Sequence, residues 1–483
     1  MSLRVAAEGT GSRFTRLSAL DLMFLRIECE AWPAHFGGLA VLGEGDLVDR
    51  SGGLRLGEVI DRLGRRVPNM PQLRRRILFP GPFRGRPLWV DDQDFDLHRH
   101  VFETAVPPPG DDRALLDRAA ELCGSVLDRS RPLWELWFLT GLSDGRLGVL
   151  LKLHHAVADG LAAVALMASL FDTGQGVSEQ GATTWQPQPL PTGSSLLLDN
   201  LSVRIRWLGG VATRLAHPVS HARNLHLTAG VARRMLGPGR APRTSLNRRV
   251  GVGRRVQFLG LDLAAAKEAA HGRGGKVNDV VLGIWAGGLR QLLLSRGETV
   301  AQLEPVTTVP ASLRLSSDAG LSGNQLGATA VALPVWEPDV ERRLSLIVSR
   351  TRQAKAGQTA AAAMNLLAAL SATPLGRYFA AHQHAANVEV TNVVGPPEPV
   401  NLFGAPVLAI LPIVQPVGNM GPILCAFSYA GKLFLVVTAD ANCFPDLEVL
   451  SAGMATDARV LLGASSVREP DGMNERLNLR ELP

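Results

Sequence analysis

The chain has 483 residues, of which 46% are hydrophobic and 19% charged, and its formal net charge is +6. This length exceeds what one ordinary hydrophobic core organises, and the apolar fraction excludes a disordered chain, so we expect two large folded lobes. No run reaches the roughly 18 uninterrupted apolar residues of a membrane span, because polar residues such as Lys152 and Asp159 interrupt the most apolar stretches.

The amino-terminal segment carries arginines but no continuous apolar stretch followed by a small-residue cleavage site, so we expect a cytoplasmic protein. The four cysteines are scattered without the paired spacing of a zinc site or the density of a disulfide framework. We predict that they are buried small hydrophobic residues, and no metal site is indicated: Cys29, Cys123, Cys425 and Cys443.

Short strands and helices alternate over residues 17–170. Hydrophobic spacing predicts a mixed α/β lobe, with two strands joined by a turn at Ser143, Asp144 and Gly145. The predicted strands are 36–43, 133–142 and 145–155, and the predicted helices are 54–67 and 115–127.

A basic connector follows this lobe. The stretch from Thr173 to about Gly193 is rich in Gly, Gln, Thr and Pro, which is typical of a linker. About a dozen arginines and no acidic residue occur from Asn200 to Leu261, and residues 196–236 are predicted to form one or two basic helices.

Alternation of strands and helices resumes near Val250, with a strand predicted over 254–263 and helices over 264–272 and 279–297. The predicted organisation is an N-terminal lobe over residues 1–180, a Pro/Gly-rich and basic helical connector over 181–249, and a C-terminal lobe over 250–483.

The stretch "LLKLHHAVADGLAAVALM", residues 150–167, places three ionisable groups in apolar surroundings. An unsatisfied polar group there costs roughly 1 to 3 kcal/mol, so these groups need partners or a function. Strand alternation puts His154 and His155 on opposite faces. Asp159 suits the N-cap of an apolar helix beginning at Leu161, and Gly160 permits a tight turn before it.

A neutral imidazole accepts a proton from a hydroxyl at physiological pH, so His155 at the strand end is the candidate general base. His154, which faces the other way, would brace the site. The alternative is that both histidines are hydrogen-bonded core residues and that Asp159 only caps a helix. No nearby cluster of carboxylates or cysteines completes a metal site.

Several motifs then point to one family. "HHAVADG" at 154–160 resembles the HHxxxDG motif of the bacterial wax ester synthase/acyl-CoA:diacylglycerol acyltransferase family. Pro132, Leu133 and Trp134 match its PLW motif, and Asn278 and Asp279 match its ND block within "VNDVVLGIWAGGLRQLLLSRGE". The resemblance extends over nearly all of residues 14–463, through "LWVDDQDFDLHRHV", "VPASLR", "TNVVGPPEPVNLFGAPV" and "SYAGKLFLVVTADANCFPD".

The resemblance implies a two-lobed α/β fold, like chloramphenicol acetyltransferase and condensation domains, with a central tunnel into which His155 projects. It implies transfer of a fatty acyl group from acyl-CoA to the hydroxyl of diacylglycerol, or of a long-chain alcohol to give a wax ester. Transfer would be direct, with acyl-CoA as a substrate and no cofactor. Ala34, His35 and "VVGPPEP" depart from the family pattern, so acceptor preference is not carried over.

The other motif residues would have supporting roles. Asn278 would donate to the oxyanion of the tetrahedral intermediate or would cap the helix that follows. Asp159 would pair with an arginine from elsewhere and hold the histidine loop. Pro132, Leu133 and Trp134 would line the tunnel mouth or only anchor a strand.

The basic connector, residues 200–255, is expected to attract coenzyme A phosphates or anionic lipid headgroups, which would give peripheral contact with a membrane or lipid droplet. Nucleic acid is not an expected partner, because no recognition motif accompanies the arginines. Two other functions remain: a weakly active lipid-droplet or envelope lipid-binding protein, and a condensation-type acyltransferase that uses a carrier protein.

Overall fold

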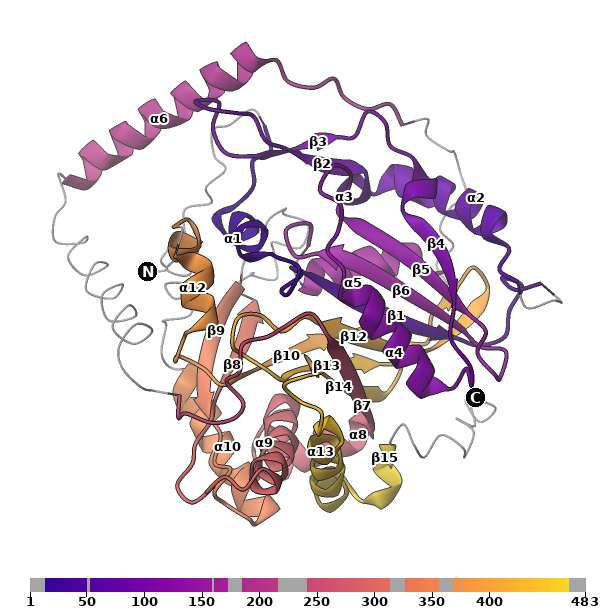
Figure 1. Cartoon of the computed structure of the whole chain (residues 1–483), viewed down its shortest axis with the longest axis vertical. Coiled ribbons are helices and arrows are strands. Elements are labelled where there is room, and N and C mark those ends of the chain that lie inside the picture. Colours follow the sequence, from indigo (N-terminus) through magenta and orange to yellow (C-terminus); the bar gives the residue numbers. More distant parts are fainter. Residues whose placement is uncertain are drawn as a thin grey trace.

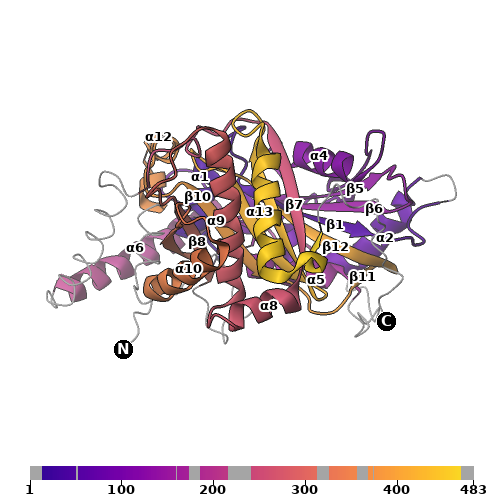
Figure 2. The same ribbon diagram turned by 90° about the horizontal axis from the view of Figure 1, so that it is seen from below.

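Two β-sheets organise the chain, and Figures 1 and 2 show how helices pack around them. The structure is a computed structural model. It describes residues 14–49, 53–158, 160–172, 185–215, 241–312, 326–355, 368–373 and 375–468. In this part of the chain, no helix is both long enough and apolar enough to cross a membrane.

The first sheet has the strand order β11-β12-β1-β6-β5-β4. Helix α4 lies against one face, where Cys123 approaches Gly37, and α5 lies against the other, where Met167 approaches Gly38. The predicted elements of this lobe are confirmed, with these bounds: β1 His35–Leu42, α2 Leu56–Arg66, α4 Asp112–Cys123, β5 Trp134–Thr140, β6 Leu147–His154 and α5 Gly160–Leu170. The edge strand β4 (Val101–Ala105) was not predicted.

The second sheet has the order β15-β7-β14-β13-β10-β8-β9. Helices α9 and α13 pack together over it, and the fully buried Trp285 of α9 lies in the core that they share with the sheet. The elements are β7 Arg254–Asp262, α8 Leu263–His271, α9 Val277–Ser295, β8 Val306–Ser312, β9 Leu326–Ala332, α10 Val340–Lys355, β10 Val388–Val394, β13 Ile423–Tyr429, β14 Lys432–Asp440, α13 Leu447–Leu462 and β15 Val467–Arg468.

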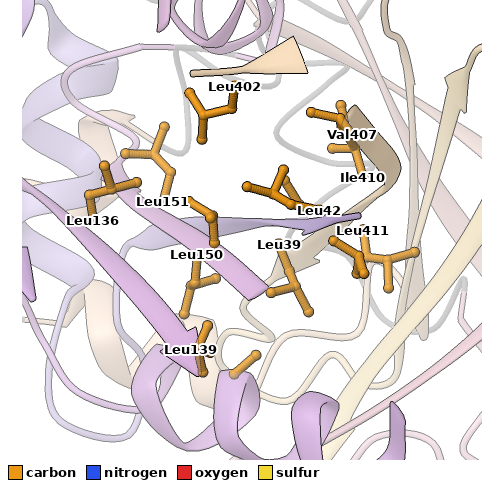
Figure 3. Packing of buried hydrophobic residues seen from close by; sticks show 14 of the residues in the cluster. Leu39, Leu42, Leu136, Leu139, Leu150, Leu151, Leu402, Val407, Ile410 and Leu411 are labelled. Atoms are coloured by element: carbon orange, nitrogen blue, oxygen red, sulfur yellow. The ribbon is translucent and has the colours of Figure 1, made fainter. Parts of the chain in front are cut away.

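The first sheet is completed by strands from the second half of the sequence. β11 (Asn401–Leu402) and β12 (Ala405–Val414) belong to it, and β12 pairs antiparallel with β1 in the register Phe36↔Val414. Figure 3 shows Ile410 and Leu411 packed with leucines of the first lobe such as Leu39. The predicted C-terminal lobe, 250–483, therefore supplies part of the N-terminal sheet and its core.

The remaining elements lie outside the two large sheets. They are α1 (Ala19–Ile27), α3 (Pro71–Arg74), the hairpin β2 (Arg75–Leu78) and β3 (Leu88–Asp91), α6 (Gly193–Leu215) and α12 (Gly376–Ala381). Figure 1 shows α6 at the edge of the molecule beside this hairpin. Helix α6 confirms part of the predicted basic helical segment, and residues 216–240 lie outside the described residues.

All four cysteines are free. Cys123 and Cys425 are buried as predicted, whereas Cys29 and Cys443 are only partly buried, so the expectation for these two is wrong. Cys443 follows the end of β14 in a turn, where its backbone N–H donates to Asp440 Oδ1.

Candidate active site

The two histidines of the motif lie where β6 ends and the chain turns toward α5. His154 is the last residue of β6 and stands directly opposite His35 of β1. His155 instead contacts Phe36, the next residue of β1, with ring centroids 4.9 Å apart. Adjacent strand residues point to opposite faces, so the two imidazoles occupy different environments, as the alternation predicts.

His155 is held by its backbone and by aromatic contacts. Its N–H donates to the carbonyl of Ala34 at 2.9 Å, and its ring stacks on Phe24 of α1 with centroids 4.7 Å apart. Burial, with a smaller effect from the neighbouring His154, lowers the pKa of His155 to about 3. The imidazole is therefore uncharged at physiological pH.

His154 is fully buried and has a defined tautomer. The N–H of Ala156 donates to Nδ1 at 3.0 Å, so the ring proton lies on Nε2, which faces Glu28 Oε1 at 3.4 Å. The backbone N–H of His154 donates to the Leu133 carbonyl at 3.1 Å. These contacts fix the orientation of the ring. Both ring nitrogens face protein groups, so neither is available to bind a substrate.

Glu28, at the C-cap of α1, connects both histidines. Its Oε1 accepts the N–H of Ala34, the residue whose carbonyl holds His155, and its Oε2 accepts two bonds from Arg129 at 2.6 and 3.0 Å. Burial raises the pKa of Glu28, but the facing His154 imidazole and the hydrogen bonds from Ala34 and Arg129 lower it to about 2. The carboxylate is therefore ionised.

The face of the sheet that carries His154 also carries other buried polar side chains, which bind protein groups and hold the structure. His35 Nε2 donates to the Cys123 carbonyl at 3.0 Å, and burial together with the charge of Lys152 lowers the pKa of His35. Lys152 is fully buried and pairs with Glu135 at 3.1 Å. A buried pair of this kind fixes geometry and adds little net stability.

The PLW residues anchor β5. Trp134 begins the strand, donates from Nε1 to the Leu73 carbonyl at 2.8 Å and stacks on His100 with centroids 4.5 Å apart. Leu133 is fully buried and packs with Ala156, and Pro132 is also buried. These contacts agree with the anchoring alternative, and the Leu133 carbonyl also supports His154.

Asn278 and Asp279 lie in the first turn of α9 in the second lobe. The N-cap is Lys276, so the alternative that Asn278 caps this helix is wrong. Asp279 accepts the Lys276 N–H and the Thr351 hydroxyl, both at 2.7 Å, and so holds the helix start. Within the described ranges no hydrogen bond joins Asn278 to either histidine, and its oxyanion role stays a prediction.

Two motif residues are only partly accounted for. Gly160 is the first residue of α5, whereas Asp159 lies outside the described residues, so its pairing with an arginine stays a prediction. In the rest of the chain that is described, no group of three His, Cys, Asp or Glu residues could hold a metal ion.

Sequence reasoning missed the residues that surround the histidines, namely Phe24, Glu28 and Arg129. They come from α1 and from the loop before β5, and no short-range spacing links them to the motif. The one available signal was an acidic residue, Glu28, directly after an amphipathic helix in the stretch "LRIECEAW".

Comparison with known proteins identifies the family and the fold of this chain. The model of the wax ester synthase/diacylglycerol acyltransferase catalytic domain matches residues 17–281, and that of the WS/DGAT C-terminal domain matches 322–461. The probable diacylglycerol O-acyltransferase tgs1 of Mycobacterium tuberculosis (strain H37Rv) is 30% identical over 466 residues, which is 94% of this chain and 97% of that protein.

Two solved structures show the same fold. The wax ester synthase/diacylglycerol acyltransferase from Marinobacter aquaeolei VT8 superposes with a TM-score of 0.65 at 22% identity, over 93% of this chain and 100% of that one. The starter condensation domain of rhizomide synthetase superposes with a TM-score of 0.56 at 13% identity, over 98% of this chain and 99% of that one. The predicted two-lobed, condensation-domain-like α/β fold is confirmed.

Proposed function

Because the chain belongs to the wax ester synthase/diacylglycerol acyltransferase family, we propose that it moves a fatty acyl group from acyl-CoA to the free hydroxyl of diacylglycerol and forms triacylglycerol. The observation that carries this proposal is His155, an uncharged imidazole held at the end of β6 between aromatic rings.

In the proposed reaction, His155 takes the proton of the acceptor hydroxyl while that oxygen attacks the thioester carbonyl. The tetrahedral intermediate then collapses: the C–S bond breaks, and the coenzyme A thiolate leaves and receives the proton from the imidazolium. His154 and Glu28 act as positioning residues, since they hold the backbone and the turn from which His155 projects.

The cysteines support direct transfer without an acyl-enzyme. Burial raises the pKa of the Cys123 thiol to about 12, and burial also raises that of Cys425. A thiol attacks as the thiolate, so these two groups are poor nucleophiles at neutral pH. The proposal therefore needs acyl-CoA as a substrate and no resident cofactor or metal.

We propose that the phosphates of coenzyme A bind at the end of the basic connector. Arg243, Arg248 and Arg296 line an open surface pocket of about 670 Å³ together with Glu298 and Asp446, and Asp446 pairs with Arg296, so Arg243 and Arg248 are the candidates for phosphate binding. From this pocket the chain continues to Val250, whose carbonyl accepts the Trp32 indole N–H at 3.0 Å, close in sequence to Ala34 and Glu28. Arginines are suited to phosphate groups through charge-assisted hydrogen bonds.

This site is tested by the KM for acyl-CoA. The double variant Arg243→Ala/Arg248→Ala is expected to raise that KM at least about fivefold and to leave kcat close to wild type. Arg342→Ala, which removes an exposed arginine of α10, is the matched control. An unchanged KM in the double variant would remove this pocket from the proposal.

The acceptor is identified by a direct assay. Purified protein is incubated with labelled palmitoyl-CoA and either dioleoylglycerol or hexadecanol, and the neutral lipids are resolved. We expect triacylglycerol as the main product, as the name of the M. tuberculosis relative suggests, and wax ester synthesis is the alternative. Absence of both products would favour a lipid-binding protein or an enzyme that needs a carrier protein.

We also propose peripheral contact with a membrane or lipid droplet, since the acceptor dissolves in lipid and not in water. The basic segment supports this contact, because each arginine near an anionic surface contributes about 1 kcal/mol. Such binding should weaken between low and physiological salt, as the screening length shortens to about 8 Å.

A further inference from the structure

Helix α6 exposes a continuous apolar stripe. Its exposed aliphatic residues recur at helical spacing, and at 3.6 residues per turn they fall within an arc of about 100°. Their exposed fractions range from 47% to 64%, although large aliphatic side chains are usually buried. They are Leu197, Leu198, Leu201, Ile205 and Leu208.

The opposite side of α6 is attached to the protein. Leu196 packs with Leu88 and Val90 of β3, and buried Asp199 pairs with Arg16 at 2.7 Å. Among the residues that the structure describes, the stripe is therefore not the face by which the helix packs against its own chain. The helix itself lies at the edge of the molecule, beside the hairpin that anchors it (Figure 1).

The β2–β3 loop extends the same apolar surface. Asn200 of α6 donates to the Phe83 carbonyl at 2.6 Å, so the tip of the loop adjoins the helix. Phe83 is 77% exposed, and Phe79 in the same loop is 57% exposed. An aliphatic stripe beside an exposed aromatic loop forms one patch, which we call the α6 patch. Such patches mark interaction sites.

The charges around the α6 patch are positive. Asp199 is the only acidic residue of α6, and its charge is already matched by Arg16. Arg204 lies at the border of the stripe, and Arg84 is exposed in the β2–β3 loop. A cationic rim around an inserted apolar face fits the anionic headgroups and acyl chains of a lipid surface.

We propose that the α6 patch docks the protein on an anionic lipid surface, with α6 lying in the plane of the headgroups and its stripe inserted among the acyl chains. This inference rests on the proposed function for its rationale, because the acceptor resides in such a surface. The patch is also joined to the site: Arg16, which anchors α6, lies just before α1, and α1 carries Phe24, the ring stacked on His155.

The test measures flotation of the full chain with phosphatidylcholine vesicles that contain or lack 30 mol% phosphatidylglycerol. Ile205→Glu places a charge in the middle of the stripe and is expected to reduce the partition coefficient at least about tenfold. Val460→Glu introduces the same charge at a position of similar exposure on α13, 55% against 60%, and should bind like wild type. Equal binding by the two variants would overturn the proposal.

Two further measurements separate the outcomes. With a short-chain acyl-CoA and a water-soluble alcohol, Ile205→Glu should keep wild-type turnover, so loss of binding with retained chemistry isolates docking from catalysis. Absence of turnover in the wild type with every acceptor would refute the proposed function and leave the flotation result standing. A lipid-free dimer that Ile205→Glu converts to monomer would assign the patch to a second copy and overturn lipid docking.

Discussion

Glu28 and His154 meet at the centre of the site, with Oε1 of the carboxylate 3.4 Å from Nε2 of the imidazole. Arg129 binds the other carboxylate oxygen, and the Ala34 N–H binds the first. Glu28 is thus a fixed charge that orients His154 directly and His155 through Ala34. The two histidines therefore have different proposed roles: His154 positions the site, and His155 reacts with the acceptor hydroxyl.

Substitution of His155 tests the reacting group. His155→Ala is expected to lower kcat/KM for acyl transfer by about 10²- to 10⁴-fold, as removal of a general base does. The far-ultraviolet circular dichroism should not change, because the side chain lies at a strand end. His98→Ala, an exposed histidine near β4, is the control. More than about a tenth of wild-type turnover in His155→Ala would exclude it as the base.

His154→Ala should affect stability more than activity, the reverse of what is expected for His155→Ala. The buried ring accepts the Ala156 N–H, so its removal leaves this buried donor without a partner, at roughly 1 to 3 kcal/mol, and takes one contact away from the buried Glu28 carboxylate. Thermal unfolding should therefore show a larger loss of stability than in His155→Ala, with a smaller loss of activity. Equal losses in both measurements would contradict the separate roles.

The low pKa of His155, about 3, predicts the pH dependence of the reaction. A base whose pKa is lowered stays unprotonated throughout the usual assay range, so kcat/KM should be flat from pH 5 to pH 8. A solvated histidine would instead give an inflection near pH 6.5. The profile is measured with a soluble alcohol as acceptor. An inflection between pH 6 and 7 would show that the reactive imidazole is exposed to water.

Glu28 predicts an acid-dependent stability. Its pKa is about 2 in the folded chain and near 4.5 when unfolded, so the charged carboxylate stabilises the fold above pH 4.5, and this contribution is lost as pH falls toward 2. Glu28→Gln should destabilise the protein by roughly 3 kcal/mol at pH 7. In thermal unfolding, the difference from wild type should shrink below pH 4.5. Glu58→Gln, on the exposed side of α2, serves as control.

The order of bond changes is tested by intact mass. Enzyme mixed with acyl-CoA alone should remain the unmodified 51.6 kDa chain, and coenzyme A should be released rapidly only after an acceptor is added. The reason is that direct attack by the acceptor needs no acyl-enzyme. Detection of an acyl adduct that disappears when the acceptor is added would contradict direct transfer and would indicate a covalent nucleophile in the protein.

The local part of the site was accessible from sequence. Strand alternation placed His154 and His155 on opposite faces, and the apolar run predicted α5 after the turn. Their surroundings were not accessible, because Glu28 and Arg129 approach from a helix and a loop that are far away along the chain. Periodicity describes one element at a time, whereas these contacts depend on how α1 packs against the end of β6.

Domain organisation shows the same limit. Hydropathy predicted strands alternating with helices from Val250 onward, and the seven-stranded sheet with its helices agrees with that prediction. The pattern of β12 is apolar like that of its neighbours, so nothing in residues 405–414 indicates pairing with β1 in place of a strand of the second lobe.

The pairing of β12 with β1 makes the two halves of the sequence mutually dependent. A fragment that ends before residue 400 would lack the strand that covers one edge of β1, and an uncovered, apolar edge strand promotes aggregation. Neither half is then an independent folding unit. Two co-expressed halves, divided within the connector, should recover function only if they assemble around this shared sheet. The two halves of the chain are thus complementing fragments that the connector holds in one polypeptide.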